Sequence, residues 1–291
     1  MNGSIFTVAL PLALAVIMFG LGLSLTVGDF VRVAAVPKAA IVALTCQILV
    51  LPLIAFGLVL LFDLDPPLAV GLMLLAASPG GTTANLFSHL AGGDVALNVT
   101  LTAVNSVIAT VTLPIVVGLS MAHFLGEGSI GAQPAKMLQV FAIVLVPVVI
   151  GMAVNRRFPA FAERARGPVK IASAVILVLV IAAALASAWD VFTANVVSMG
   201  SVALILSCLS LAVGYWVPKL FGVDRRQSIA SAMEIGIHNS TLAITVALSV
   251  LDSEVIAIPP AMYGIVMFLP AAVVAYVVSR RRETAPTAAA A

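Results

Sequence analysis

Residues 68–91 read LAVGLMLLAASPGGTTANLFSHLA, an apolar stretch of membrane-spanning length that is interrupted at residues 78–85 by SPGGTTAN. A transmembrane helix needs about 20 predominantly apolar residues. Proline removes a backbone donor and clashes with the preceding turn, and paired glycines weaken the helix further. Unwound backbone at this depth is tolerated only where it is buried in protein or lines a watery cavity. The stretch therefore predicts a broken helix inside a membrane protein.

The composition of the whole chain agrees with this prediction. Of its 291 residues, 62% are hydrophobic and only 9% are charged, whereas a soluble domain is about 25% charged. This composition excludes a soluble enzyme, a nucleic-acid binder and a disordered chain. The apolar runs are continuous and do not alternate at a period of two, so we expect an all-α integral membrane protein. We expect no cleavable signal peptide, because the first apolar run is too long and no basic residue precedes it.

Nine apolar segments predict nine transmembrane helices: 4–28, 38–62, 68–91, 95–123, 136–155, 169–189, 195–217, 227–251 and 256–279. With this count, thirteen of the fourteen Lys and Arg residues fall on one side of the membrane, and only Lys136 lies on the other. The positive-inside rule then places the N-terminus outside and the C-terminus in the cytoplasm of a cell whose inner (plasma) membrane holds the protein. The tail 280–291 is expected to be disordered and cytoplasmic.

A second span, 227–251, is also interrupted, by Glu234-Ile235-Gly236-Ile237-His238-Asn239-Ser240-Thr241. Each interrupted span is the middle member of a triplet of spans, and the two triplets run in opposite directions through the membrane. Interrupted helices at corresponding places in inverted repeats point to the site of a secondary transporter. The alternative is that the Pro-Gly-Gly segment is only a kink packed by its neighbours.

Glu234 is the only one of twelve acidic residues that lies inside a predicted span. A carboxylate buried in a membrane costs several kcal/mol and by default marks a site for an ion, a proton or a partner charge. The only basic residues within these bounds, Lys38, Lys136 and Lys170, lie at the ends of their spans, so none in a span interior could neutralise it. A bound cation, held by carboxylate, amide, hydroxyl and carbonyl oxygens, is favoured. A protonated Glu with a purely structural role is the alternative.

Candidate oxygen donors for such a cation lie in the second to fourth spans. Gln47 is near the middle of the second span, and Asn85 closes the first break. Asn98, Thr102 and Asn105 follow at helical spacing in the fourth span and share one face. Each of these side chains alone could instead make an interhelical hydrogen bond. Their concentration in the same triplet favours one polar centre.

Several of these motifs together resemble the bile acid:sodium symporter family. The matching residues are IMFGLGL at 17–23, Pro37-Lys38, Gln47, the first break with Asn85, and Glu234-Ile235-Gly236 followed by Asn239-Ser240. The resemblance covers essentially the whole chain and fits the nine-span members of the family. It implies a core domain with two discontinuous, crossing helices, formed by residues 38–123 and 195–279. It also implies a panel domain formed by residues 1–37 and 136–190.

The resemblance implies two sodium sites and one substrate site. The first sodium site would use Asn85, Asn98, Thr102 and Glu234, and the second Gln47, Glu234, the carbonyls of Ile235 and Ile237, and the side chain of His238. The family commonly has Gln at position 238, and an imidazole nitrogen is a poor sodium ligand. Ala84 offers only backbone where the bacterial pattern more often has Ser. The substrate would lie between core and panel, near Thr82, Thr83, Asn239, Ser240 and the half-helix N-termini, whose free amides attract anions.

The function implied is sodium-driven symport of an organic anion by alternating access, with a bile acid, a steroid sulfate, pantoate or a keto acid as substrate. The lipid bilayer is the other partner, and neither nucleic acid nor an obligatory protein partner is expected. A proton-coupled organic anion carrier or exporter that uses Glu234 and His238 stays open, as does a channel. An enzyme is not expected, because the chain has no GxSxG or HExxH motif and no second carboxylate in the middle of a span.

Overall fold

The computed structural model describes residues 31–126, 134–187 and 189–283, together with isolated positions between 15 and 28. Within these ranges the chain folds into helices and forms no strand. Four helical stretches among the described residues are long and apolar enough to cross a membrane: Pro37–Leu61, Val95–Leu125, Trp189–Leu220 and Glu254–Ser279. The prediction of an all-helical fold is confirmed for the described residues, and these four stretches are consistent with a membrane protein. The first predicted span falls mostly outside the described residues, so the count of nine stays a prediction.

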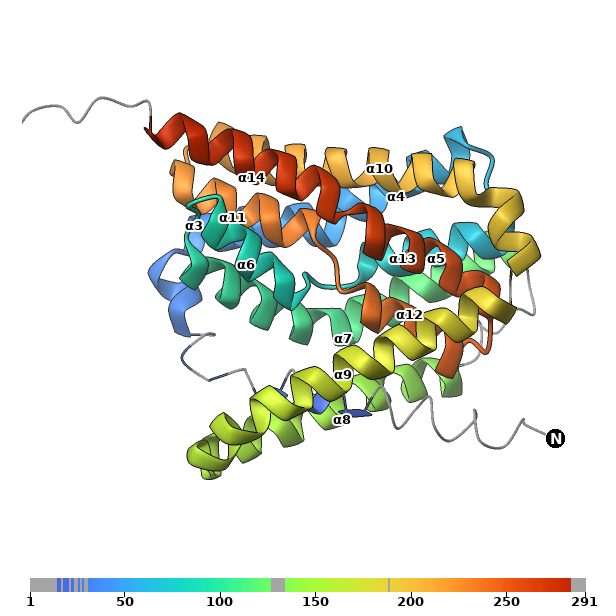
Figure 1. The fold of residues 1–291 in the computed structure, drawn as a ribbon, viewed down its shortest axis with the longest axis horizontal. Coiled ribbons are helices and arrows are strands. Elements are labelled where there is room, and N and C mark those ends of the chain that lie inside the picture. The colour runs from blue at the N-terminus through green and yellow to red at the C-terminus, as the bar shows by residue number, and fades with distance from the viewer. Residues whose placement is uncertain are drawn as a thin grey trace, which may run out of the picture.

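The described helices follow one another along the chain with short connections. In order they are η1 (Arg32–Ala35), α3 (Pro37–Thr45), the π-helical turn η2 (Cys46–Val50), α4 (Leu51–Leu61), α5 (Pro66–Ala77), α6 (Thr82–Leu90), α7 (Val95–Leu125), α8 (Pro134–Arg157), α9 (Pro159–Ser187), α10 (Trp189–Leu220), α11 (Arg225–Gly236), α12 (Ser240–Ser249), α13 (Glu254–Val266) and α14 (Phe268–Glu283). In Figure 1, α8 and α9 lie side by side along one edge of the molecule, and α10 and α14 lie along the opposite edge.

Both predicted breaks are present, and the two broken segments pair with each other. Gly80 and His238 form an antiparallel bridge between the α5–α6 connection and the α11–α12 connection. The amide of Gly81 donates to the Ile237 carbonyl at 2.7 Å, and the amide of Asn239 donates to the Pro79 carbonyl at 2.8 Å. Backbone groups that leave a helix inside a membrane need other partners. Each break supplies them to the other, and we call this paired segment the crossover.

The turns that precede α5 and α11 are built alike, which supports the predicted repeat. Residues 61–65 read LFDLD and residues 220–224 read LFGVD. The third residue of each has a positive φ, 46° at Asp63 and 73° at Gly222. The fifth residue, Asp65 or Asp224, is the N-cap of the helix that follows. Two turns of the same construction therefore open the two interrupted helices.

Several predicted boundaries differ from the observed ones, among them the start of α10, which lies at Trp189 and not at residue 195. The span expected at 169–189 belongs to α9, which begins at Pro159 and takes in the basic residues that were assigned to a loop. Proline is favoured at the first helical position, and Arg166 donates to the Leu23 carbonyl at 2.9 Å and to Asn155 Oδ1 at 3.1 Å. The arginine therefore lies against other segments of the same chain instead of in a free loop. At the other end, α14 continues to Glu283, past the point where a disordered tail was expected to begin, and residues 284–291 lie outside the described part.

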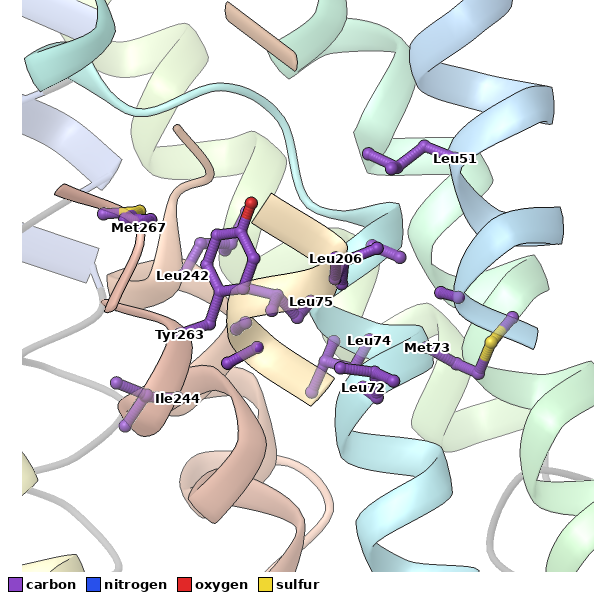
Figure 2. Packing of buried hydrophobic residues seen from close by; sticks show 14 of the residues in the cluster. Leu51, Leu72, Met73, Leu74, Leu75, Leu206, Leu242, Ile244, Tyr263 and Met267 are labelled. Carbon is purple, nitrogen blue, oxygen red and sulfur yellow. The ribbon is translucent and has the colours of Figure 1, made fainter. Parts of the chain in front are cut away.

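Glycines let the helices around the crossover approach one another closely. A Cβ at Gly214 in α10 would lie 2.7 Å from the Cα of Ala232 in α11. A Cβ at Gly71 in α5 would overlap the carbonyl of Ile256 in α13. Small residues at such contacts are typical of helix packing in membranes. Larger side chains from the same helices, including Leu75, Leu206 and Tyr263, belong to the apolar cluster around the crossover (Figure 2).

Candidate functional site

Glu234 lies in the last turn of α11, directly before the second break, and its side chain is buried. The Thr102 hydroxyl in α7 donates to Glu234 Oε2 at 2.6 Å. The other carboxylate oxygen, Oε1, makes no hydrogen bond of good geometry, although the Gly80 backbone lies beside the carboxylate. A Cβ added at Gly80 would overlap this carboxylate, so the glycine brings the first break directly against it. The acidic side chain therefore touches the crossover from α11 and is bonded to α7.

Helix α7 presents the face that the sequence predicts toward α11. Asn98 Nδ2 donates to the Ala230 carbonyl at 2.8 Å, and Asn98 Oδ1 has no partner. The Thr102 hydroxyl also lies 3.0 Å from the Asn98 carbonyl, so its single proton is shared between two acceptors. The structure thus brings together three of the four residues expected at the first sodium site. Asn105, one turn further along α7, is buried, and its amide nitrogen has no partner.

A second group of side chains meets at the Ser78 carbonyl, in the first break. Gln47 Nε2 donates to this oxygen at 3.0 Å, and His238 Nδ1 lies 3.2 Å from it. Because a carbonyl only accepts, we assign the imidazole proton to Nδ1, which leaves Nε2 as a bare acceptor. Gln47 Oε1 and His238 Nε2 are buried and have no partner. Gln47 belongs to the π-helical turn Cys46–Val50, a distortion that is frequent at functional sites.

Four buried carboxylate or side-chain amide oxygens near the two breaks lack hydrogen-bond partners within the described structure: Gln47 Oε1, Asn85 Oδ1, Asn98 Oδ1 and Glu234 Oε1. Native structures leave few buried polar atoms unsatisfied, and each such atom calls for an explanation. Hard cations prefer oxygen ligands of these types. Among the described residues, no group of three or more His, Cys, Asp or Glu side chains could hold a metal ion. The donor set fits an alkali cation better than a transition metal.

The four residues expected to bind substrate do not share one environment. Thr82 begins α6, and Thr83 in the same turn is exposed. Asn239 is half-buried, and its Oδ1 accepts from the Leu242 amide at 3.1 Å as the N-cap of α12, which leaves Nδ2 as a donor. Ser240 is buried and packs against Gly264 in α13. Thr83 and Asn239 are therefore more accessible than Ser240.

Two contributors to this region were not predicted from the sequence. The Ser78 backbone carbonyl joins Gln47 to His238, and no side-chain pattern could reveal it. Tyr263 in α13 donates to the Gly236 carbonyl at 2.9 Å, and its ring contacts the His238 ring edge to face. A tyrosine inside the predicted span 256–279 could have been singled out, because a buried phenol hydroxyl needs a partner.

Comparisons with known proteins identify relatives along most of the chain. A sequence model of the Sodium Bile acid symporter family matches residues 11–195. An uncharacterized sodium-dependent transporter of Bacillus subtilis (strain 168), YocS, is 28% identical over 253 residues, 87% of this chain and 77% of that protein. The human ileal sodium/bile acid cotransporter is 26% identical over 245 residues, 83% of this chain and 69% of that protein.

A plant relative is longer than this chain. The probable sodium/metabolite cotransporter BASS2 of rice (Oryza sativa subsp. japonica), a chloroplastic protein, is 27% identical over 265 residues. These residues are 91% of this chain but only 61% of the rice protein. The names of all three relatives describe transporters or cotransporters that depend on sodium, and none describes an enzyme.

Proposed function

This chain belongs to the Sodium Bile acid symporter family, and we propose that it is a secondary active transporter that couples sodium to the symport of an organic anion. The observation that carries this proposal is the crossover itself. Two broken helices pair there, next to a buried carboxylate and to buried oxygens that have no partners. Broken helices of this kind hold the substrate and the coupling ion in secondary transporters.

The first sodium site in this proposal consists of Asn85, Asn98, Thr102 and Glu234. It is supported by the Thr102–Glu234 hydrogen bond of 2.6 Å and by the free oxygens of Asn98 and Glu234. A cation there satisfies both free oxygens and neutralises a carboxylate that is costly to bury alone. Asn85 brings a further free oxygen from the first turns of α6.

The second sodium site consists of Gln47, Glu234, the carbonyls of Ile235 and Ile237, and His238. The free Oε1 of Gln47 supports it. His238 fits less well, because its Nδ1 is engaged with Ser78 and only a nitrogen remains. The Ile237 carbonyl also accepts a hydrogen bond from Gly81. In this site the glutamine and the carboxylate are the principal ligands.

The anion binds on the accessible side of the crossover, between the core and panel domains. The Thr83 side chain, the backbone amides of Thr82 and Thr83 and Asn239 Nδ2 are the donors that recognise it. Helix α6 has no side-chain cap, so its N-terminus presents free amide donors and the positive end of its dipole. Substrates with a carboxylate or sulfate head fit these donors. The printed names of the human and rice relatives, which refer to bile acids and metabolites, support this class of substrate.

The negative charge of Glu234 couples sodium binding to anion binding. In the absence of sodium, the Glu234 carboxylate disfavours an anion at the crossover. Sodium neutralises Glu234 and orders the paired breaks, which completes the anion site. The loaded core then moves against the panel, formed by the first predicted span, α8 and α9, and opens the site to the other side of the membrane.

Uptake into proteoliposomes tests this function. Purified protein is reconstituted and offered a labelled bile acid, a steroid sulfate, pantoate and a keto acid under an inward sodium gradient. We expect saturable uptake of one of these anions that requires sodium and is lost in Glu234→Gln. Uptake driven by a proton gradient without sodium would instead support a proton-coupled carrier. Non-saturable flux would support a channel.

A further inference from the structure

Tyr263 has no place in the binding sites described above, yet its side chain is fully buried beside the crossover. It lies in α13, in the same apolar cluster as Leu75, Leu206 and Leu242 (Figure 2). A buried hydroxyl among such side chains costs free energy unless it is hydrogen-bonded. Its hydroxyl donates to the Gly236 carbonyl at 2.9 Å. The hydroxyls of Ser207 and Ser210 in α10 also lie beside this phenol, and the bond that it donates goes to a backbone oxygen of the second break.

Gly236 is the last residue of α11, two positions after Glu234. Carbonyls at a helix C-terminus have no partner within the helix, and the break prevents α12 from supplying one. A Cβ at this position would overlap the Leu211 side chain, so glycine lets α10 and α11 pack closely here, and glycine is also the residue type with the freest backbone. Tyr263 supplies the missing donor from another helix. It thereby restrains the backbone where the sequence allows most freedom.

The carbonyls on either side of Gly236 are those of Ile235 and Ile237. Because each peptide unit is planar and only two dihedral angles separate neighbouring units, anchoring one carbonyl restricts the directions of the next ones. The Tyr263 ring also contacts the His238 ring, with centroids 5.3 Å apart and an interplanar angle of 71°. The same side chain thus restrains the break at residues 236 and 238, on both sides of Ile237.

We infer that Tyr263 is a positioning residue for the coupling ion: it holds the second break in the conformation that presents the Ile235 and Ile237 carbonyls and Glu234 to sodium. The inference rests on the proposed sodium coupling. It assigns no ligand role to the phenol, which acts through the backbone. Removal of its hydroxyl releases the Gly236 carbonyl and broadens the directions of its neighbours. Sodium binding then has to order the second break as well, and this lowers the affinity for sodium.

A sodium titration of thermal stability tests the inference. Wild type, Tyr263→Phe and Tyr276→Phe are purified in detergent and heated at increasing sodium chloride concentrations, with choline chloride keeping the ionic strength constant. Tyr263→Phe keeps the ring and loses only the hydroxyl. Tyr276→Phe is the matched control, because Tyr276 is an exposed tyrosine of α14. We expect Tyr263→Phe to raise the sodium concentration for half-maximal stabilisation about fivefold, the factor that corresponds to one neutral hydrogen bond, and Tyr276→Phe to leave it unchanged.

A purely structural role for Tyr263 gives a different result. Tyr263→Phe would then lower the melting temperature equally at all sodium concentrations and leave the half-maximal concentration as in wild type, which overturns the inference while wild type still responds to sodium. If wild type shows no response to sodium over choline, the proposed function and the inference both fail. If Tyr263→Phe does not survive purification, binding of radioactive sodium to membranes that contain each variant decides the same point. Wild-type affinity there overturns the inference.

Discussion

Glu234 is the residue on which the proposed sodium coupling depends. Its carboxylate is buried, one oxygen is bonded to Thr102, and the other makes no hydrogen bond of good geometry. An isolated charge inside a membrane costs free energy, so such residues typically mark a site where an ion, a proton or a partner charge is bound. The predictions at the scale of single residues therefore concern the side chains that touch this carboxylate.

Thr102→Val removes the hydroxyl that donates to Glu234 and keeps nearly the same shape. A hydrogen bond to a charged group is worth about 1.5–3 kcal/mol, so we expect sodium affinity to fall by about tenfold or more. The measurement is radioactive sodium binding to purified protein. Thr112→Val is the matched control in α7, because the Thr112 hydroxyl bonds only to the Ile108 carbonyl of its own helix, at 3.3 Å. Equal affinities in the two variants would contradict the assigned role of Thr102.

Gly80→Ala places a methyl group where the Glu234 carboxylate lies. Overpacking of this kind costs about 1–3 kcal/mol, and the displaced carboxylate should lose its response to sodium. Thermal stability measured with and without sodium checks both effects. Gly57→Ala is the control, since nothing lies within 4 Å of the added Cβ. In a helix interior that change should stabilise by about 0.5–1 kcal/mol. A sodium response in Gly80→Ala equal to that of wild type would contradict the proposed geometry.

At the scale of elements, the two turns before the broken helices make the repeat testable. Gly222 has a φ of 73° where its counterpart Asp63 has 46°, a conformation that Asp tolerates much better than β-branched residues do. A Cβ at Gly222 would lie 3.3 Å from Lys38 Nζ. We therefore expect Gly222→Asp to reproduce the first turn and cost less than about 1 kcal/mol, and Gly222→Val to cost about 2 kcal/mol. Thermal melting in detergent measures the stability of both variants. Equal losses of stability in Gly222→Asp and Gly222→Val would argue against equivalent turns.

The two breaks and the crossover between them show what the sequence can and cannot predict. Both breaks lie where Pro79 and Gly236 indicate, because missing donors and weak helix formers act locally. The grouping of Asn98 and Thr102 against α11 follows from helical periodicity. The partners across the crossover were not predictable, because they depend on backbone groups such as the Ser78 carbonyl.

Other features depend on tertiary contacts and were not predicted either. The π-helical turn at Cys46–Val50 leaves no compositional signal in an apolar run. The early start of α9 was missed because charged residues in a sequence look like a loop, whereas Arg166 finds acceptors on neighbouring chain. The inward direction of Ser240, against Gly264, likewise appears only when α12 and α13 are packed together.

At the scale of the whole molecule, the nine-span prediction fixes which loops face which side. The loop at Asp65 should face outside and the loop at Arg225 the cytoplasm, and both side chains are exposed. In a background without Cys46 and Cys208, Asp65→Cys should react with a membrane-impermeant maleimide in intact cells. Arg225→Cys should react only after the cells are opened. The reverse pattern, or reaction of both residues in intact cells, would contradict the predicted orientation and span count.

In the proposed function, the crossover binds sodium through Glu234. The most direct test is equilibrium binding of radioactive sodium to purified wild type, Glu234→Gln and Glu254→Gln. Glu254 lies in the first turn of α13, outside the proposed sites, and serves as the control. We predict saturable binding in wild type and Glu254→Gln, and no saturable binding in Glu234→Gln. Binding in Glu234→Gln with the affinity of wild type would contradict the account.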